Sequence, residues 1–170
     1  MKIAIKTLIF STVLIAFVAV SCSKDDSEGD SELSKEGGPF ELSELAGNWE
    51  ANLATFTRTS DNLEVAIVGD GGSVSLTVQS NDKCTFTINP VDCEAYTESG
   101  ELFWEFNSEN GEYYLAIVWD DFPDDGGTSF YVILSNNTFS MWCFEDCAEY
   151  DFNCDGSPET AFLNFNFIKN

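Results

Sequence analysis

The chain has 170 residues, with 30 acidic and seven basic side chains and no histidine, and its formal net charge is −23. The electrostatic field of such a negative charge repels nucleic acid and anionic lipid, which excludes a DNA or RNA partner. Without histidine the chain lacks the usual general base and the commonest transition-metal ligand, so zinc hydrolysis and Ser-His-Asp or Cys-His catalysis are excluded in their normal forms. We therefore expect a protein that is not an enzyme. A hydrolase that uses carboxylates alone is the least favoured alternative, because no two carboxylates are marked as opposed across a cleft.

The first 21 residues have the pattern of a secretory leader. Lys2 and Lys6 supply a positive start, and a mostly apolar run of 13 residues follows from Leu8 to Val20. That run is shorter than the roughly 20 apolar residues that a membrane-spanning helix needs. The part beyond the leader carries all the acidic residues and five of the basic ones, for a net charge of −25.

Ala19-Val20-Ser21-Cys22 resembles the lipobox of bacterial lipoproteins, in which the cysteine is lipidated and becomes the mature N-terminus. Ser23-Lys24-Asp25-Asp26 resembles the export signal of surface lipoproteins in the Bacteroidetes group. This resemblance implies a signal peptide over residues 1–21 and a lipid on Cys22 that holds the protein at a membrane. It also implies an outer-membrane protein exposed at the cell surface, with a periplasm-facing position as the alternative.

Residues 22–40 hold the predicted lipidated cysteine and an acidic tether, and residues 41–170 hold one domain. Ser, Asp, Glu, Lys and Gly dominate the tether, which has Leu33 as its only large apolar residue before Phe40. Because such a segment cannot bury a core, we expect it to be disordered. A short helical turn is predicted at Phe40–Leu45.

Period-two alternation of apolar and polar residues then predicts eight or nine short strands. Eight of them are predicted in chain order as Trp49–Leu53, Val74–Gln79, Cys84–Ile88, Glu101–Asn107, Tyr113–Trp119, Phe130–Leu134, Phe139–Phe144 and Ala161–Ile168. Turn residues separate them, and Asn110-Gly111 is the strongest hairpin signal among these. We predict an all-β fold, an antiparallel meander barrel of about eight strands, with a β-sandwich as the alternative.

Alternation also predicts which side chains point into the barrel. We expect these inward residues to be Trp49, Ala51, Leu53, Val74, Leu76, Val78, Phe86 and Ile88. An eight-stranded barrel is just wide enough to be filled by side chains or to hold one small ligand. The 15 phenylalanines favour filling, so we expect a narrow cavity at most.

Leu45-Ala46-Gly47-Asn48-Trp49 resembles the opening of the first strand in lipocalin-like proteins, which carry Gly-x-Trp there. The family's Trp plugs one end of the barrel, an Arg from the last strand packs over it, and the interior binds a small apolar molecule. Lys169 is the only basic residue in the corresponding last strand here. The resemblance implies a non-catalytic binding module for a small apolar ligand or an envelope partner.

Three predicted strands are apolar on both faces, which leaves a second function open. These are Leu102–Phe106, Tyr113–Trp119 and Phe130–Leu134. Either the chain's own loops cover their outer faces, which is the commoner case, or an exposed patch meets a partner. A β-sandwich that docks another protein is therefore the alternative function.

Five cysteines remain once Cys22 is lipidated, namely Cys84, Cys93, Cys143, Cys147 and Cys154. Export favours disulfides, and an odd number leaves one thiol unpaired within the chain. We expect at least one disulfide involving Cys143, Cys147 or Cys154. The spacing does not define the connectivity.

A candidate calcium site lies before the last predicted strand. Its ligands would be Asp151, Asn153, Asp155, Ser157 and Glu159, which match the first positions of an EF-hand-type loop with Gly156 at the sharp turn. An EF-hand-type loop carries a bidentate acid at the position that Phe162 occupies in this chain. The alternative to a calcium site is an ordinary acidic turn. A second acidic loop, with Asp120, Asp121, Asp124 and Asp125, is predicted to be solvated.

Overall fold

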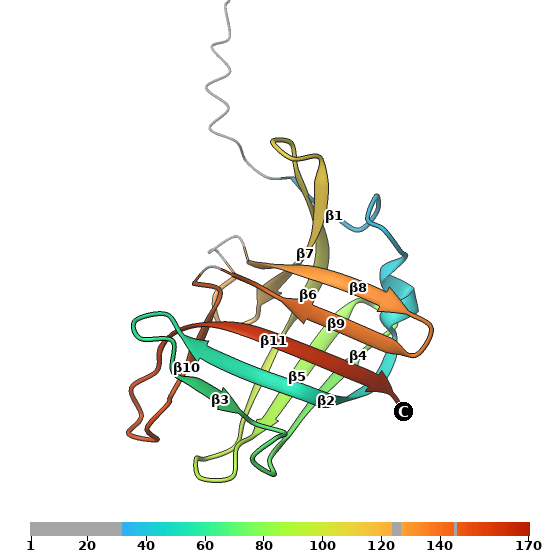
Figure 1. Ribbon diagram of the computed structural model, residues 1–170. Helices are drawn as coiled ribbons and strands as arrows, with labels where there is room; N and C mark the ends of the chain where they lie inside the picture. Colours follow the sequence, from blue (N-terminus) through green and yellow to red (C-terminus); the bar gives the residue numbers. More distant parts are fainter. Residues whose placement is uncertain (1–31, 124–126, 145) are drawn as a thin grey trace, which may run out of the picture. The chain divides into compact units, whose positions relative to one another are not determined.

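The computed structural model describes residues 32–123, 127–144 and 146–170 (Figure 1). The predicted leader, Cys22 and the predicted tether up to residue 31 lie outside these residues, so their roles stay predictions. The described elements are β1 (Leu33–Ser34), the 3₁₀ helix η1 (Leu42–Leu45), β2 (Gly47–Arg58), β3 (Glu64–Ala66), β4 (Ser73–Val78), β5 (Lys83–Asn89), β6 (Tyr96–Asn107), β7 (Glu112–Trp119), β8 (Thr128–Ser135), β9 (Thr138–Trp142), β10 (Ala148–Tyr150) and β11 (Glu159–Lys169). None of the described helices is long and apolar enough to cross a membrane.

Eight strands of the described part close into an antiparallel barrel. In pairing order they are β2, β4, β5, β6, β7, β8, β9 and β11, and β11 returns to pair with β2. The short strands β3 and β10 pair with the far end of β2 and with the start of β11. The fold is thus all-β and a meander barrel, as the alternation predicts, and the sandwich alternative is wrong.

The predicted inward faces are confirmed for β4 and β5 and corrected in β2. Val74, Leu76 and Val78 are buried, as are Phe86 and Ile88. In β2, Trp49 is buried, but Leu53 is 42% exposed. The pairing register between β2 and β11 shifts at this point, because Phe167 pairs with Ala51 while Asn166 pairs with Leu53. One extra residue, Asn52, bulges out of β2 and reverses the alternation beyond it, so Ala54 and Phe56 point inward instead.

One end of the barrel is closed around Trp49, which is fully buried. The indole Nε1 of Trp49 donates a hydrogen bond to the carbonyl oxygen of Leu45 in η1, at 2.7 Å. Lys169, on the last strand, places its Nζ 4.9 Å from the centre of the Trp49 ring and donates to the carbonyl oxygen of Glu44. The lysine therefore occupies the position that the resemblance assigns to an arginine. Gly47 has φ +136°, and a Cβ there would lie 2.9 Å from Cε of Lys169, so this position requires glycine.

The end of the predicted tether is ordered, which corrects the expected disorder over Leu33–Phe40. Leu33 and Ser34 form β1 and pair with β6. Phe40 packs edge-on against Trp104, with ring centres 4.9 Å apart. Gly38 lies directly on the Trp104 indole, where any Cβ would overlap the ring. This segment helps to close the same end of the barrel that Trp49 plugs.

The outer faces of the doubly apolar strands are partly covered and partly exposed. Nζ of Lys35, from the N-terminal segment, lies 3.7 Å from the centre of the Phe103 ring on β6. On β7 to β9 the outer aromatic cluster, which we define as Tyr114, Tyr131, Trp142 and Phe144, lies on the surface. The Tyr131 and Trp142 rings are stacked with centres 5.8 Å apart, and Phe144 is 71% exposed. The chain's own segment covers β6, while β8 and β9 present an apolar surface.

Candidate functional site: the open end of the barrel

A cavity of about 660 Å³ opens at the end of the barrel opposite Trp49. Its walls come from the ends of β2, β5, β7 and β9, from the starts of β6, β8 and β11, and from β10 with the neighbouring loops. The apolar side chains that line it are Phe56, Phe86, Ile88, Trp119, Phe122, Phe130, Met141, Leu163 and Phe165. The expectation of a narrow cavity at most is therefore wrong for this end, although aromatic side chains do fill the closed end.

Four carboxylates also line the cavity, namely Glu98, Asp121, Asp146 and Glu149. Glu98 lies on the inward face of β6, whereas a strand with one wet face normally carries its acids outside. Its side chain is exposed to solvent at the mouth. Desolvation by the surrounding wall, followed by repulsion from Asp121 and Glu149, raises the pKa of Glu98 above its ordinary value.

Two side chains in the same wall of the cavity combine an aromatic ring with a polar group. The indole Nε1 of Trp119 donates a hydrogen bond to Oγ1 of Thr128 at 2.9 Å, which fixes the ring across the β7–β8 connection. The Trp119 and Phe86 rings meet edge to face with their centres 6.0 Å apart. Tyr96 lies at the start of β6, and desolvation followed by repulsion from Glu98 raises its pKa, so it stays a neutral phenol at physiological pH.

Two disulfides hold the loops at this end. Cys93, between β5 and β6, pairs with Cys154, between β10 and β11, and Cys143 pairs with Cys147 between β9 and β10. The expected disulfide is thereby confirmed. Among the described residues Cys84 is the free cysteine, and burial raises the pKa of its thiol to about 12, so it is protonated and unreactive. The two disulfides thus lie at the open end of the barrel, where the interior is a cavity and not a packed core.

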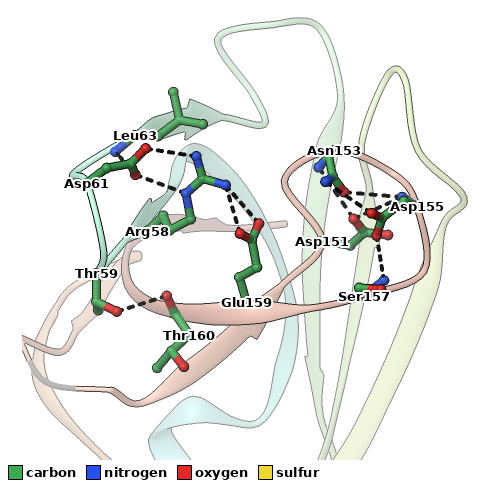
Figure 2. A network of polar contacts seen from close by, with 10 residues as sticks. All are labelled: Arg58, Thr59, Asp61, Leu63, Asp151, Asn153, Asp155, Ser157, Glu159 and Thr160. Atoms are coloured by element: carbon green, nitrogen blue, oxygen red, sulfur yellow. Dashed lines mark hydrogen bonds and ion pairs between the residues drawn. The ribbon is translucent and has the colours of Figure 1, made fainter.

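The loop predicted to bind calcium is folded around the carboxylate of Asp151 (Figure 2). Its Oδ1 accepts hydrogen bonds from the backbone N–H groups of Asn153 and Asp155, and its Oδ2 accepts one from Gly156 at 2.7 Å. Asp155 accepts in turn from the backbone N–H of Ser157. Desolvation raises the pKa of Asp151, but these backbone hydrogen bonds together outweigh it and hold the pKa below its ordinary value.

The last of the five predicted ligands, Glu159, is engaged elsewhere. One guanidinium nitrogen of Arg58 donates to both carboxylate oxygens of Glu159, at 2.8 and 2.9 Å (Figure 2). The other two nitrogens of Arg58 bind Asp61, both at 2.9 Å. In the part of the chain that the structure describes, no three acidic or cysteine side chains converge as a metal site would require. Calcium binding stays a prediction.

The sequence reasoning named no ligand-binding residue and predicted the loop that contains Asp121 to be solvated, so it missed the groups at the mouth. Asp120, from the same acidic loop, pairs with Lys83 at 3.7 Å instead of facing the cavity, and Asp124 and Asp125 lie outside the described residues. Glu98 was missed because its strand was expected to begin at Glu101. The alternation could have shown that Glu98 points inward, because Glu98 lies an even number of residues before the inward residues Leu102 and Trp104.

The strand pairings and the cavity define a closed antiparallel β-barrel with one packed end and one open end. No protein-family model and no curated protein matches the chain. Among solved structures the chain is similar to a de novo designed fluorescence-activating β-barrel, at 14% sequence identity. The likeness covers 77% of this chain and 99% of that chain with a TM-score of 0.34.

Proposed function

We propose that this protein is a lipid-anchored, non-catalytic binding protein whose barrel takes up one small apolar ligand through its open end. The observation that carries the proposal is the cavity of about 660 Å³. That volume falls within the roughly 300–1,000 Å³ of typical small-molecule sites, which are mostly apolar with a few polar groups. The wall has this composition, and the disulfides hold the rim in place without filling it.

The neutral fluorescent probe N-phenyl-1-naphthylamine tests this proposal on the mature protein. We expect saturable binding with one probe per chain. Ala148 lines the cavity and is only partly buried, so Ala148→Trp should fill part of the volume and weaken binding about tenfold, a loss of about 1.4 kcal/mol.

The matched control is Thr97→Trp, which adds the same ring on the exposed outer face of β6 and should leave probe binding unchanged. Melting curves of both variants establish that they fold. The proposal fails if the parent protein shows no saturable binding, or if folded Ala148→Trp binds the probe as tightly as the parent.

The anchor is the second part of the proposal and is supported by the motif at Ala19-Val20-Ser21-Cys22. We expect Cys22→Ser to move the protein out of the membrane fraction, because serine lacks the thiol that would carry the anchoring acyl chains. Replacing Lys24, Asp25 and Asp26 together by Ala should hide the protein from protease added to whole cells. A Cys22→Ser protein that stays in the membrane fraction as firmly as the parent removes the anchor from the proposal.

A second candidate function is docking of an envelope protein through the outer aromatic cluster. The observation that favours it is the exposure of Phe144 and of Ile133, which is 57% exposed on the outer face of β8. Ile133→Ser with Phe144→Ser should abolish such a complex and leave probe binding intact. The reverse pattern, in which only Ala148→Trp loses binding, assigns the function to the cavity.

A further inference from the structure

We infer that the ligand is a cationic amphiphile, whose apolar tail enters the barrel while a positively charged head group binds at the carboxylates of the mouth. This inference rests on the proposed function and deepens it, because it names the chemical class of the molecule that the cavity takes. The carboxylates are those already described, Glu98, Asp121, Asp146 and Glu149.

The pairing register places Glu98 inside the barrel. Trp49 pairs with Leu76, Leu76 pairs with Phe86, and Phe86 pairs with Glu98. Residues paired directly across antiparallel strands lie on the same face of the sheet. Since Trp49 is fully buried, the ladder that contains it is the interior face, and Glu98 is an acid at an interior position. Acids on the outer face would be sufficient for solubility, so solubility alone does not explain an acid at this interior position.

The protein supplies no cation to these carboxylates from its described residues. No lysine or arginine lines the cavity. The four described basic side chains are engaged elsewhere: Lys35 with Asp82 and Glu101, Arg58 with Asp61 and Glu159, Lys83 with Asp120, and Lys169 with Trp49 and the carbonyl oxygen of Glu44. A positive head group would therefore meet several carboxylates and no competing positive charge, whereas a fatty acid would be repelled.

Aromatic rings beside the carboxylates suit an ammonium head group. Phe86 is the cross-strand neighbour of Glu98, and Tyr96, Trp119 and Phe122 line the same cavity. The faces of such rings attract cations, and aromatic cages are a common means of binding quaternary ammonium groups. The wall thus offers an apolar volume for a tail and, at its rim, both charge and ring faces for a head group.

Competition against bound N-phenyl-1-naphthylamine tests the inference with probes that share one ten-carbon tail. We expect decyltrimethylammonium to bind about tenfold more tightly than decanol, and decanoate to bind more weakly than decanol. Tetramethylammonium, which has the head but no tail, should fail to compete at the concentrations where decyltrimethylammonium does. Glu98→Gln should reduce the preference for the cation over decanol, measured as the ratio of the two affinities.

Glu50→Gln is the matched control, because it removes one negative charge from the exposed outer face of β2. It should keep the full preference for the cation, which separates a local site from attraction by the net charge. Equal affinities for decyltrimethylammonium and decanol, or equal effects of Glu98→Gln and Glu50→Gln, overturn the inference while the proposed function stands. Absence of saturable decanol and probe binding contradicts the proposed function itself.

Discussion

At the scale of single residues, Glu98 and Asp151 show how position decides what a carboxylate does. Glu98 is solvent-exposed and Asp151 is partly buried in an acidic protein. Glu98 lies on an interior face, where desolvation, followed by repulsion from Asp121 and Glu149, raises its pKa. Asp151 is surrounded by backbone N–H donors, and its pKa is lowered. The two groups therefore affect stability in opposite directions as pH changes.

Removing the charge of Glu98 should stabilise the protein at neutral pH. A raised pKa in the folded state means that the folded state binds more protons, so stability is lost as pH rises through the folded pKa of Glu98. Asp121, Asp146, Glu149 and Tyr96 face this group, and none of them supplies a positive charge. We expect Glu98→Gln to melt higher than the parent at pH 8 and the gain to vanish near pH 4. An unchanged or lower Tm at pH 8 contradicts this.

Asp151→Ala should destabilise the protein at neutral pH, because three backbone N–H groups lose their acceptor. A lowered folded pKa gives stability that is present above the unfolded pKa and is lost as pH falls through the folded pKa. The deficit in Tm should therefore shrink at acid pH. The same melting curves test calcium, since an ion that binds only the folded loop raises the Tm of the parent and not that of the variant. No calcium shift leaves the loop an acidic turn.

At the scale of elements, the two ends of the barrel are stabilised by different means. Packing of η1, Trp49 and Lys169 closes one end, while disulfides hold the loops of the other. The difference follows from the cavity, because loops around an empty mouth bury too little apolar surface to hold each other. Each end can therefore be weakened separately.

Lys169→Ala should lower the free energy of unfolding by about 1 kcal/mol, the size of a partly exposed cation–π contact together with one hydrogen bond. Lys169→Arg should keep most of this stability, because a guanidinium can make both contacts. Lys83→Ala serves as the control, since its ion pair with Asp120 is exposed and 3.7 Å long and such pairs contribute little. Urea unfolding measures all three, and equal losses in the two alanine variants contradict the role of Lys169.

The two disulfides should differ in their contribution to stability. The Cys93–Cys154 bridge closes a separation of 61 residues and the Cys143–Cys147 bridge a separation of four. Loop-closure entropy predicts losses of about 4 and about 2 kcal/mol when each pair is replaced by serine. Denaturant unfolding of Cys93→Ser with Cys154→Ser, and of Cys143→Ser with Cys147→Ser, measures them. A larger loss for the shorter loop would contradict this order.

At the scale of the whole molecule, the alternation rule predicts the barrel but not all of its interior. It identifies the inward residues of β4 and β5, because those strands are regular and pair along their full length. It fails at Leu53, since the bulge at Asn52 depends on the register with β11, more than 100 residues away in the chain. The Cys93–Cys154 pairing and the acidic mouth also depend on distant loops that meet only in the fold, so local spacing does not reveal them.

Deleting β11 should prevent folding altogether. This strand pairs with β2, β9 and β10, so a chain that ends at Ser157 leaves β10 without a partner, gives β2 and β9 one unpaired edge each and opens the barrel. We expect such a chain to show no cooperative melting transition and to aggregate, because unpaired strand edges associate. A chain that ends at Phe167 keeps most of the pairing and should still fold, though less stably. A cooperative transition in the shorter chain contradicts this.

The pairing of β2 with β11 also governs how quickly the protein reaches its native state. Trp49 pairs with Lys169, so the barrel is completed by a contact between nearly opposite ends of the domain. Contacts of such high sequence separation make folding slow, because the loop-closure entropy is lost before the contact stabilises anything. A chain emerging from a ribosome cannot complete its barrel until β11 has emerged. Until then it is an open sheet with two exposed edges, and such edges favour aggregation.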